Sequence, residues 1–509
     1  MSKKNNAAAT VGFIFITMLL AKLLGQVREI VIASAYGTAW QADAYVAASQ
    51  IPTNFFDMIL GSAVSSAFIP VFNKYLQQEG EVRAKHFAGV FFNVILLITV
   101  ILSFFGVIFA PAIISVFTPG LTGETAILAV KLLRIMFPMI IFIGLAFTFV
   151  GVLQSMGEYN LPAVMSMVSS GFCIIYLFTL NFKFGITGLA VSLLLGWGLQ
   201  FLILTPSTIK KGFRLVPAIK DSGILSVSKL ALPVLIGTWV QPINVLVNSM
   251  IASNFPGGVS AINYANKLYI IAAGVFAMSI TNYIFPKLSK LSSSQEGEKG
   301  WNEVFVSSLK TVLMVVTPIA IIFLAQSKEI VSVIYQRGEF GEDSVALTGG
   351  ALCFYSIGIL PFAIQEIMYK AFYSKHNSAT PMVISFVGII INIPLSIGLS
   401  KILGINGLAL STAISVITTM IISAIVLLKK SNKITALLIA FLKTIISGFV
   451  CFSVILLVKN IIINNFVISS LFSKFMLVFL CSFAGILAYL IFLGLLNLKN
   501  IKKSKKEEK

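Results

Sequence analysis

The stretch KLLGQVREIVIASAYG, residues 22–37, follows the apolar run TVGFIFITMLLA at residues 10–21. A run as apolar as this predicts a helix in a bilayer, where a span needs roughly 20 mostly apolar residues. Yet Lys22, Arg28 and Glu29 lie inside that predicted helix. A charge at the bilayer centre costs about 2.5–3.5 kcal/mol even on the lenient insertion scale, so these three charges need an explanation.

The composition places these charges in a polytopic membrane protein. Of the 509 residues, 58% are hydrophobic and only 11% are charged, and the mean hydropathy is +0.97. No soluble globular domain has this composition. No small-residue cleavage site follows MSKKNN, so we expect the first span to be uncleaved. The hydropathy pattern predicts an all-α fold with about 14 transmembrane helices, at residues 10–36, 40–76, 86–117, 125–154, 161–181, 186–207, 223–254, 259–287, 304–335, 343–374, 381–400, 405–428, 434–460 and 470–496.

The basic residues predict the orientation of these spans. The net charge is +19, and most of the basic residues fall in the tails and in alternate loops. The opposite loops contain only Lys183, Arg337, Lys401 and Lys459. The excess of positive charge on one side predicts that both termini are cytoplasmic. In a soluble chain this charge would favour nucleic acid, but here we interpret residues 499–509 as a basic tail at the membrane surface.

An internal repeat divides most of the chain into two six-helix units. GITGLAVS begins at Gly185 and GINGLALS at Gly404, and Pro162 and Pro381 open the preceding spans. Two further pairs, at residues 113 and 330 and at residues 70 and 286, have nearly the same separation. An even number of spans in each copy predicts parallel repeats, a transporter arrangement with its site between the halves. The predicted parts are an N-terminal lobe at 1–215, a C-terminal lobe at 216–430, spans 13 and 14 at 431–498, and the tail at 499–509.

Polar and small residues of the second predicted span fall on one helical face. At 100° per residue this face comprises Asp43, Gln50, Asn54, Asp57, Gly61 and Ser65, with Pro52 as a predicted kink. One interpretation is that these groups pair with neighbouring helices and stabilise packing. The other is that they line a water-filled cavity, which we favour because several charges on one face are costly in lipid.

The cations in the first and eighth spans, Lys22, Arg28 and Lys267, predict an anionic substrate. Lys22 and Arg28 are about 9 Å apart along a helix axis, a distance over which their side chains could bracket a diphosphate. The chain lacks GxxxxGK[ST], HExxH and GxSxG, so these motifs give no sign of an ATPase, a metalloprotease or a serine hydrolase. We expect no enzymatic activity and no cofactor.

Two segments carry a resemblance to a known family. AKLLGQVREIVIASAYGTAWQADAYVAASQIPTNFF, with the later SAFIPVFNKY, resembles the opening of the MurJ/MviN family, and YANKL at residue 264 resembles a motif of that family's eighth span. Its members are lipid II flippases of the multidrug/oligosaccharidyl-lipid/polysaccharide exporter superfamily. The resemblance implies a two-lobed transporter of the bacterial cytoplasmic membrane with a cationic central cavity. It also implies that spans 13 and 14 form a groove for the lipid tail.

By position, the resemblance implies that Lys22, Arg28 and Lys267 are essential cations, that Glu29 orients Arg28, and that Asp43 is an essential acidic residue. We add Gln50 and Asn54 as substrate-binding candidates and Asp57 as a gating candidate.

The chain departs from the family pattern at three places. Phe56 and Asp57 stand where some members have paired arginines, and Lys267 stands where arginine is usual. Some members bind sodium among spans 7, 11 and 12, where Asn248 and Asn392 are weak candidates. The acidic ligands expected beside them are missing, so we predict no metal site.

The sequence therefore predicts a monomeric flippase that moves lipid II across the membrane by alternating access, with membrane lipids and no nucleic acid as its other partners. A flippase for another polyprenyl-linked polysaccharide remains an alternative. So does a drug/cation antiporter, which usually has twelve spans and an acidic cavity. A membrane scaffold would not need aligned buried charges, and no loop is large enough for the nucleotide-sugar site of a glycosyltransferase.

Overall fold

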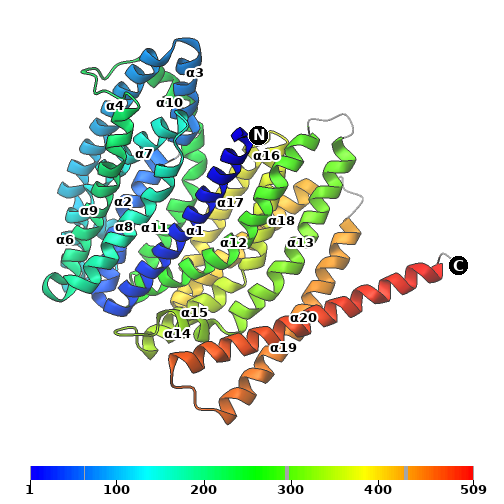
Figure 1. Cartoon of the computed structure of the whole chain (residues 1–509). Coiled ribbons are helices and arrows are strands. Elements are labelled where there is room, and N and C mark those ends of the chain that lie inside the picture. The colour runs from blue at the N-terminus through cyan, green and yellow to red at the C-terminus, as the bar shows by residue number, and fades with distance from the viewer. Residues whose placement is uncertain (1, 62–63, 293–296, 429–433, 508–509) are drawn as a thin grey trace. The chain divides into compact units, whose positions relative to one another are not determined.

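A computed structural model describes residues 2–61, 64–292, 297–428 and 434–507 of the chain. Most of the described residues are helical and none of them lies in a strand, which confirms the predicted all-α class. The elements, most of them labelled in Figure 1, are α1 (Ser2–Tyr36), α2 (Trp40–Phe56), η1 (Asp57–Gly61), η2 (Val64–Phe68), α3 (Ile69–Gln78), α4 (Glu81–Ile108), α5 (Ala110–Phe117), α6 (Gly123–Met136), α7 (Met139–Ser155), α8 (Asn160–Thr179), α9 (Asn181–Lys210), α10 (Ser222–Thr238), α11 (Val240–Ala252), α12 (Gly258–Ser292), α13 (Gly297–Ala325), α14 (Ser327–Tyr335), α15 (Glu342–Ser356), α16 (Ile359–Ser374), α17 (Ala379–Leu403), α18 (Ile405–Leu428), α19 (Ile434–Asn465) and α20 (Leu471–Glu507).

The helices have the length and composition of membrane spans. Among the described residues, ten are long and apolar enough to cross a bilayer, and up to twelve if each bent pair counts as one span. Each of the predicted spans coincides with one helix or with consecutive helices, such as α10 and α11 for residues 223–254. The exact count of fourteen stays a prediction.

Several of the predicted spans are each divided into two helices. A short break at Phe109 separates α4 from α5, and a break at Gln326 separates α13 from α14. Proline follows the first break directly, since Pro111 occupies the first turn of α5, where a missing N–H costs no intrahelical hydrogen bond. Likewise α6 and α7 are separated near Phe137, and α15 and α16 meet at a 46° bend.

The sequence predicts a kink at Pro52 in the second span, but the irregular helical turns of this span begin later, at Asp57. Helix α2 continues through Pro52 to Phe56, and π-helical turns then follow in η1 and η2. A π-helical turn uses i→i+5 hydrogen bonds, so residues after it no longer keep the 100° spacing of residues before it. Asp43, Gln50 and Asn54 lie on the regular helix α2, whereas the continuation of the predicted polar face through Asp57 and Gly61 to Ser65 stays a prediction.

The chain forms two compact units. The first comprises residues 1–260 with 337–340, and the second comprises residues 261–336 with 341–509. Helices α10 and α11, the seventh predicted span, pack in the first unit against η1, η2 and α2. In the same unit Trp239, between α10 and α11, donates a hydrogen bond from Nε1 to the carbonyl oxygen of Met58 at 2.6 Å. Packing thus divides the chain after Ser260, whereas the predicted boundary at 215 and 216 rests on the sequence repeat and stays a prediction.

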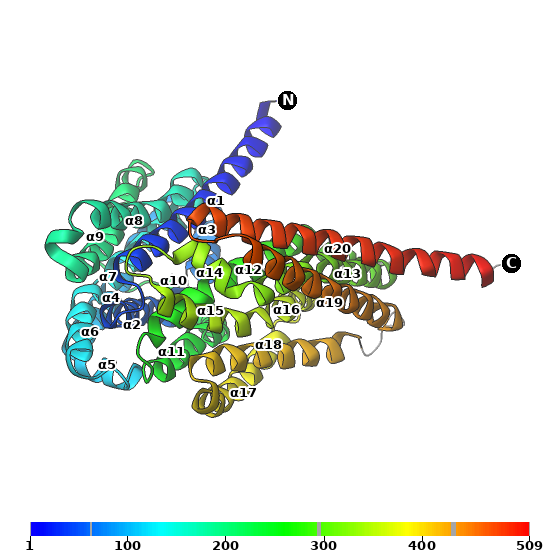
Figure 2. The ribbon, with the colours of Figure 1, turned by 90° about the horizontal axis from the view of Figure 1, so that it is seen from below.

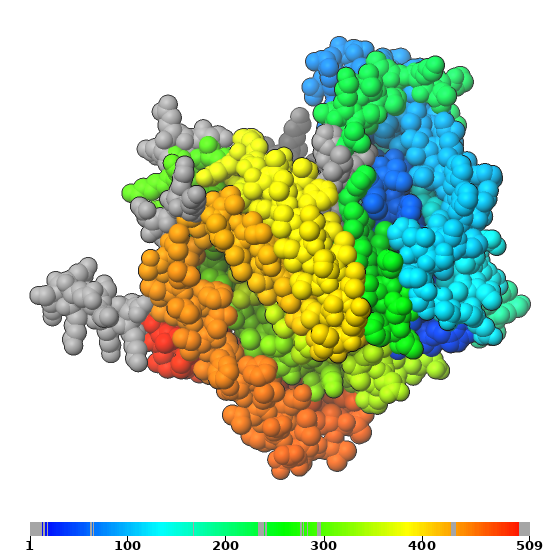
Figure 3. Space-filling model, turned by 180° about the vertical axis from the view of Figure 1, so that it is seen from behind, coloured from blue at the N-terminus to red at the C-terminus, as the bar shows by residue number. Residues whose placement is uncertain are grey.

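Helices α13, α19 and α20 run beside one another in the second unit (Figure 2). The packed side of the α19–α20 pair is a core around Cys451, Ile455 and Cys481. Much of the opposite side of α19 is exposed and apolar, as at Leu442 and Phe449, and this surface is visible in orange in Figure 3. An apolar face of this extent fits lipid rather than water.

Candidate functional site

Arg28 and Glu29 form an ion pair within the first membrane helix. Arg28 Nη2 lies 2.8 Å from Glu29 Oε1, and the two side chains are 24% and 8% exposed. Helix α1 packs on α8, and the Arg28 guanidinium is close enough to Tyr45 of α2 and Cys173 of α8 to interact electrostatically. A guanidinium has five N–H donors, so one bond to Glu29 leaves others for an anion. Lys22 is exposed on the same helix.

The side-chain amides of Gln50 and Asn54 already form hydrogen bonds within the protein. Gln50 Oε1 accepts a hydrogen bond from Ser249 Oγ of α11 at 2.8 Å. Asn54 is buried, and its Nδ2 donates to the carbonyl oxygen of Gln50 at 2.9 Å. The structural interpretation of the polar face is therefore supported for Gln50, which joins α2 to α11, and for Asn54, whose amide is bonded within α2.

The side chain of Asp43, on α2, contacts the N-terminus of α12. Its carboxylate Oδ1 accepts hydrogen bonds from the backbone N–H and the hydroxyl group of Ser260, in the first turn of α12. Asp43 is only 3% exposed. It lines a cavity of about 400 Å³ together with residues that include Trp40, Thr125 and Asn254. A carboxylate at a helix N-terminus satisfies orphan N–H groups and is stabilised by the helix dipole.

The remaining candidates are Asp57 and Lys267. Asp57 is exposed on η1, and its Oδ1 lies over Gly61, where an added Cβ would approach it to 2.9 Å. Lys267 is half-buried on α12 in the second unit, whereas Lys22 and Arg28 belong to the first. The three predicted cations are thus divided between the two units.

The two sodium candidates differ in their surroundings. Asn248 Oδ1 is buried on α11 with no hydrogen-bond partner among the described residues. Asn392 Oδ1, on α17, accepts a hydrogen bond from Ser396 Oγ at 3.3 Å. Within the described parts of the chain, no group of three or more His, Cys, Asp or Glu side chains could hold a metal ion. Both asparagines offer neutral amide oxygens, so they stay weak candidates.

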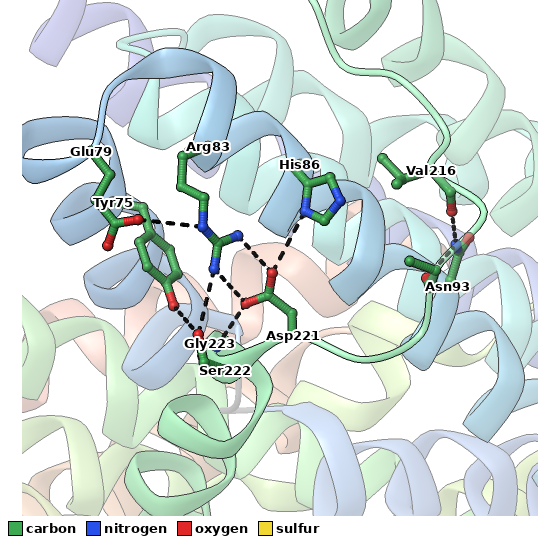
Figure 4. Close-up of polar contacts among 10 residues, drawn as sticks. Tyr75, Glu79, Arg83, His86, Asn93, Val216, Asp221, Ser222 and Gly223 are labelled. Carbon is green, nitrogen blue, oxygen red and sulfur yellow. Dashed lines mark hydrogen bonds and ion pairs between the residues drawn. The ribbon is translucent and has the colours of Figure 1, made fainter.

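A polar cluster that the sequence did not reveal fixes the linker before α10 (Figure 4). Arg83, in the first turn of α4, binds Asp221 with both arms of its guanidinium, at 2.6 and 3.0 Å. His86 Nδ1 lies 3.6 Å from the same carboxylate, and Tyr75 of α3 contacts Ser222 through hydroxyl groups 3.2 Å apart. Arg83 and Asp221 are 138 residues apart, so no local spacing could predict their pairing.

The linker is also held through its backbone. Asn93 Nδ2 donates hydrogen bonds to the carbonyl oxygens of Val216 and Ala218, at 2.5 and 3.0 Å. Burial alone would raise the pKa of the Asp221 carboxyl. The hydrogen bonds from Arg83 and the Gly223 N–H, with the charge of Arg83, outweigh burial and hold that pKa below its ordinary value. The segment between the two predicted repeats is therefore firmly attached to α3 and α4.

Comparison with known families identifies the fold that carries these sites. The family model described as lipid II flippase MurJ matches residues 32–477. The chain belongs to the MurJ family. A probable lipid II flippase MurJ of Treponema pallidum (strain Nichols) is 28% identical over 433 residues, covering 82% of this chain and 81% of that protein. One from Vibrio cholerae serotype O1 is 28% identical over 425 residues, covering 79% of each.

Solved structures agree with the MurJ assignment. A structure described as lipid II flippase MurJ in an inward closed conformation matches with a TM-score of 0.79 and 26% identity, over 96% of this chain and 99% of that one. A multidrug resistance MATE family transporter matches at 16% identity with a TM-score of 0.65, over 82% of this chain and 99% of that one, which shows the fold alone. The MurJ match begins at residue 32, so it includes Asp43 and Lys267 and leaves Lys22 and Arg28 outside.

Proposed function

We propose that this chain is a lipid II flippase, which moves the head group of the undecaprenyl-diphosphate-linked muropeptide from the inner to the outer leaflet. The observation that carries this proposal is membership of the MurJ family over residues 32–477, together with a MurJ-like fold over 96% of the chain. Such a protein is a multi-pass protein of the bacterial inner membrane and a transporter rather than a catalyst. Transport by alternating access, and action as a monomer without nucleic acid, belong to the proposal.

The proposed substrate contact is with the diphosphate. Arg28 is suited to it because its guanidinium offers paired N–H donors, while Glu29 fixes its orientation at 2.8 Å. Lys22 and Lys267 add positive charge, and Gln50 and Asn54 supply amide groups. Asp43 and Asp57 are the acidic residues proposed for gating, and Asp43 already has a helix terminus as its partner.

The fourteen-span layout with two parallel six-helix repeats is part of the proposal. Gly185 and Gly404, the first residues of the repeated motifs, support it, since their φ, ψ angles are 53°, −149° and 60°, −139°. This region is accessible almost only to glycine. The breaks at Phe109 and Gln326 also correspond in the repeats.

The finer domain assignments follow the same scheme. We assign residues 1–215 and 216–430 to the two lobes, 431–498 to spans 13 and 14 with a groove for the lipid tail, and 499–509 to a cytoplasmic tail. The excess of basic residues in alternate loops supports the assignment of both termini to the cytoplasm.

Complementation of a bacterial strain depleted of its lipid II flippase tests the proposal. Expression of this chain is expected to restore growth and cell shape, and an Arg28→Ala variant at equal abundance is the matched control. If the wild-type chain is abundant in the membrane and growth is not restored, lipid II is not its substrate. Export of another polyprenyl-linked polysaccharide would then be the next function to assay.

A further inference from the structure

Three helices of the second unit place polar side chains at one level of the membrane. Lys310 on α13 precedes the uncharged stretch 311–325, and Lys443 on α19 precedes the uncharged stretch 444–458. Asn497 on α20 follows the uncharged stretch 475–496. These stretches are roughly 22 to 33 Å long as helices, comparable to the hydrocarbon thickness of a bilayer. The three polar groups therefore lie near the headgroup level of one leaflet.

These three side chains line one pocket. It has a volume of about 280 Å³ and lies between α13, α19 and α20, with Met314, Ile439 and other apolar residues completing its walls. Lys443 Nζ donates a hydrogen bond to Asn497 Oδ1 at 2.9 Å. The lining contains two ammonium groups and no carboxylate. Both lysines are half-buried, so their charges are partly removed from water without an acidic partner in the lining.

At the other end of the α19–α20 helix pair, basic side chains are accompanied by acidic ones. There α14, α15 and the α19–α20 connection surround a pocket of about 640 Å³ that contains both basic and acidic residues. Lys459 pairs with Glu329 at 2.5 Å, and Lys474 Nζ donates to Gln336 Oε1 at 2.7 Å. Of these two pockets, only the one with Lys310 and Lys443 has an excess of positive charge in its lining, which would favour binding of an anion.

We propose that the pocket between α13, α19 and α20 binds the phosphate of an anionic glycerophospholipid such as phosphatidylglycerol. Lys310 and Lys443 contact the phosphate oxygens, and the acyl chains lie along the exposed apolar side chains of α13 and α19. Basic pockets between membrane helices bind acidic headgroups in this way, because the phosphate neutralises charges that are costly at membrane depth. A volume of about 280 Å³ is sufficient for a phosphoglycerol group. This site does not depend on the substrate that the protein transports.

Native mass spectrometry of the purified full-length protein tests the assignment. Dioleoyl phosphatidylglycerol is expected to bind in preference to dioleoyl phosphatidylcholine. The variant Lys310→Gln with Lys443→Gln should bind phosphatidylglycerol roughly tenfold more weakly, with phosphatidylcholine unchanged. The control Lys459→Gln with Lys474→Gln removes the same charge at the other end of the hairpin and should keep the preference. The variant Lys310→Arg with Lys443→Arg keeps both positive charges, so it should also keep the preference for phosphatidylglycerol. This variant shows whether a loss of binding comes from the lost charge or from misfolding.

Three results would overturn the assignment. The first is an unchanged lipid preference in the Lys310→Gln, Lys443→Gln variant, or an equal loss in the control. The second is displacement of the phospholipid by undecaprenyl diphosphate at equal concentration, which would make the pocket a site for the transported lipid. The third is equally effective displacement by inorganic phosphate at that concentration, which would make the acyl chains irrelevant. Complementation of the flippase-depleted strain is measured separately, so a failure of the proposed flippase function can be distinguished from a failure of the proposed phospholipid site.

Discussion

Asp43 and Ser260 are joined by two hydrogen bonds across 217 residues of sequence. The carboxylate Oδ1 of Asp43 accepts one from the backbone N–H of Ser260 at 2.8 Å and one from its hydroxyl group at 2.7 Å. Asp43 is thereby a cap for the first turn of α12. The acidic residue that the sequence analysis assigned to transport also has a structural role.

Replacement of Asp43 should separate these two roles. Asp43→Asn retains an oxygen that can accept from Ser260 but loses the charge at the helix terminus, which is worth about 0.3–2 kcal/mol. Asp43→Ala also leaves the backbone N–H of Ser260 without its Asp43 acceptor, at a further cost of about 1–3 kcal/mol, while the Ser260 hydroxyl can still donate to the Gly257 carbonyl oxygen at 3.2 Å. Thermal unfolding in detergent should therefore rank wild type above Asp43→Asn above Asp43→Ala. An Asp43→Ala protein as stable as wild type would contradict the capping role.

Arg28→Ala should abolish flipping while leaving the protein folded. The guanidinium is partly exposed and forms its ion pair with the adjacent Glu29, so its removal deletes an anion ligand more than a packing contact. Arg28→Lys should restore only part of the activity because an ammonium cannot form a bidentate pair. The measurement is complementation at matched membrane abundance. Normal growth with Arg28→Ala would disprove the proposed diphosphate contact.

Arg83 and Asp221 should stabilise the attachment of the linker before α10. Asp221→Asn is expected to lower the free energy of unfolding by about 1.5–3 kcal/mol, the range for hydrogen bonds to charged groups, because it weakens a bidentate pair with a 4% exposed carboxylate. Glu79→Gln is the matched control. Its carboxylate also contacts Arg83, but at 3.4 Å and half exposed, so its loss should have almost no effect. Equal effects of both substitutions on the free energy of unfolding would show that the Arg83–Asp221 pair contributes no more than an exposed surface ion pair.

The Asp221 contribution should depend on pH in one direction. Since the folded protein holds the pKa of Asp221 below its ordinary value of about 3.9, the stabilisation is fully present above that value. It is lost as the pH falls through the lower folded pKa. The difference in unfolding temperature between wild type and Asp221→Asn should thus be large at pH 7 and shrink well below pH 4. A difference that stays constant over this range would rule out an ionic origin.

Alanine at Gly185 or Gly404 should be destabilising because of the backbone conformation, and at Gly185 lack of space contributes nothing. Both residues have positive φ with extended ψ, a conformation that costs other residues about 1–3 kcal/mol, and no atom lies within 4 Å of an added Cβ at Gly185. Gly171, inside α8, has the same free space in an ordinary helical conformation. Gly171→Ala should therefore be neutral or stabilising in the same thermal assay. Comparable losses at Gly171 and Gly185 would contradict this explanation.

The sequence was sufficient for the class of fold and for the family. Each predicted span coincides with one or more helices, since a segment in lipid must satisfy its backbone hydrogen bonds internally and an apolar stretch of sufficient length therefore becomes a helix. The ion pair of Arg28 with Glu29 was also within reach, because its members are adjacent. The irregular turns from Asp57 onward were not, because the polar pattern there fits an ordinary helix equally well.

The partners of the polar side chains were decided by tertiary structure alone. Asp43 meets Ser260, Arg83 meets Asp221, and Gln50 meets Ser249, each across more than a hundred residues. Local periodicity determines which face of a helix is polar, but it carries no information about which other helix covers that face. That choice follows from how the helices pack. It gives Asp43 and Gln50, which the sequence analysis assigned to transport, contacts that also hold α2 in place. It gives Arg83 and Asp221 a contact that holds the linker on α4.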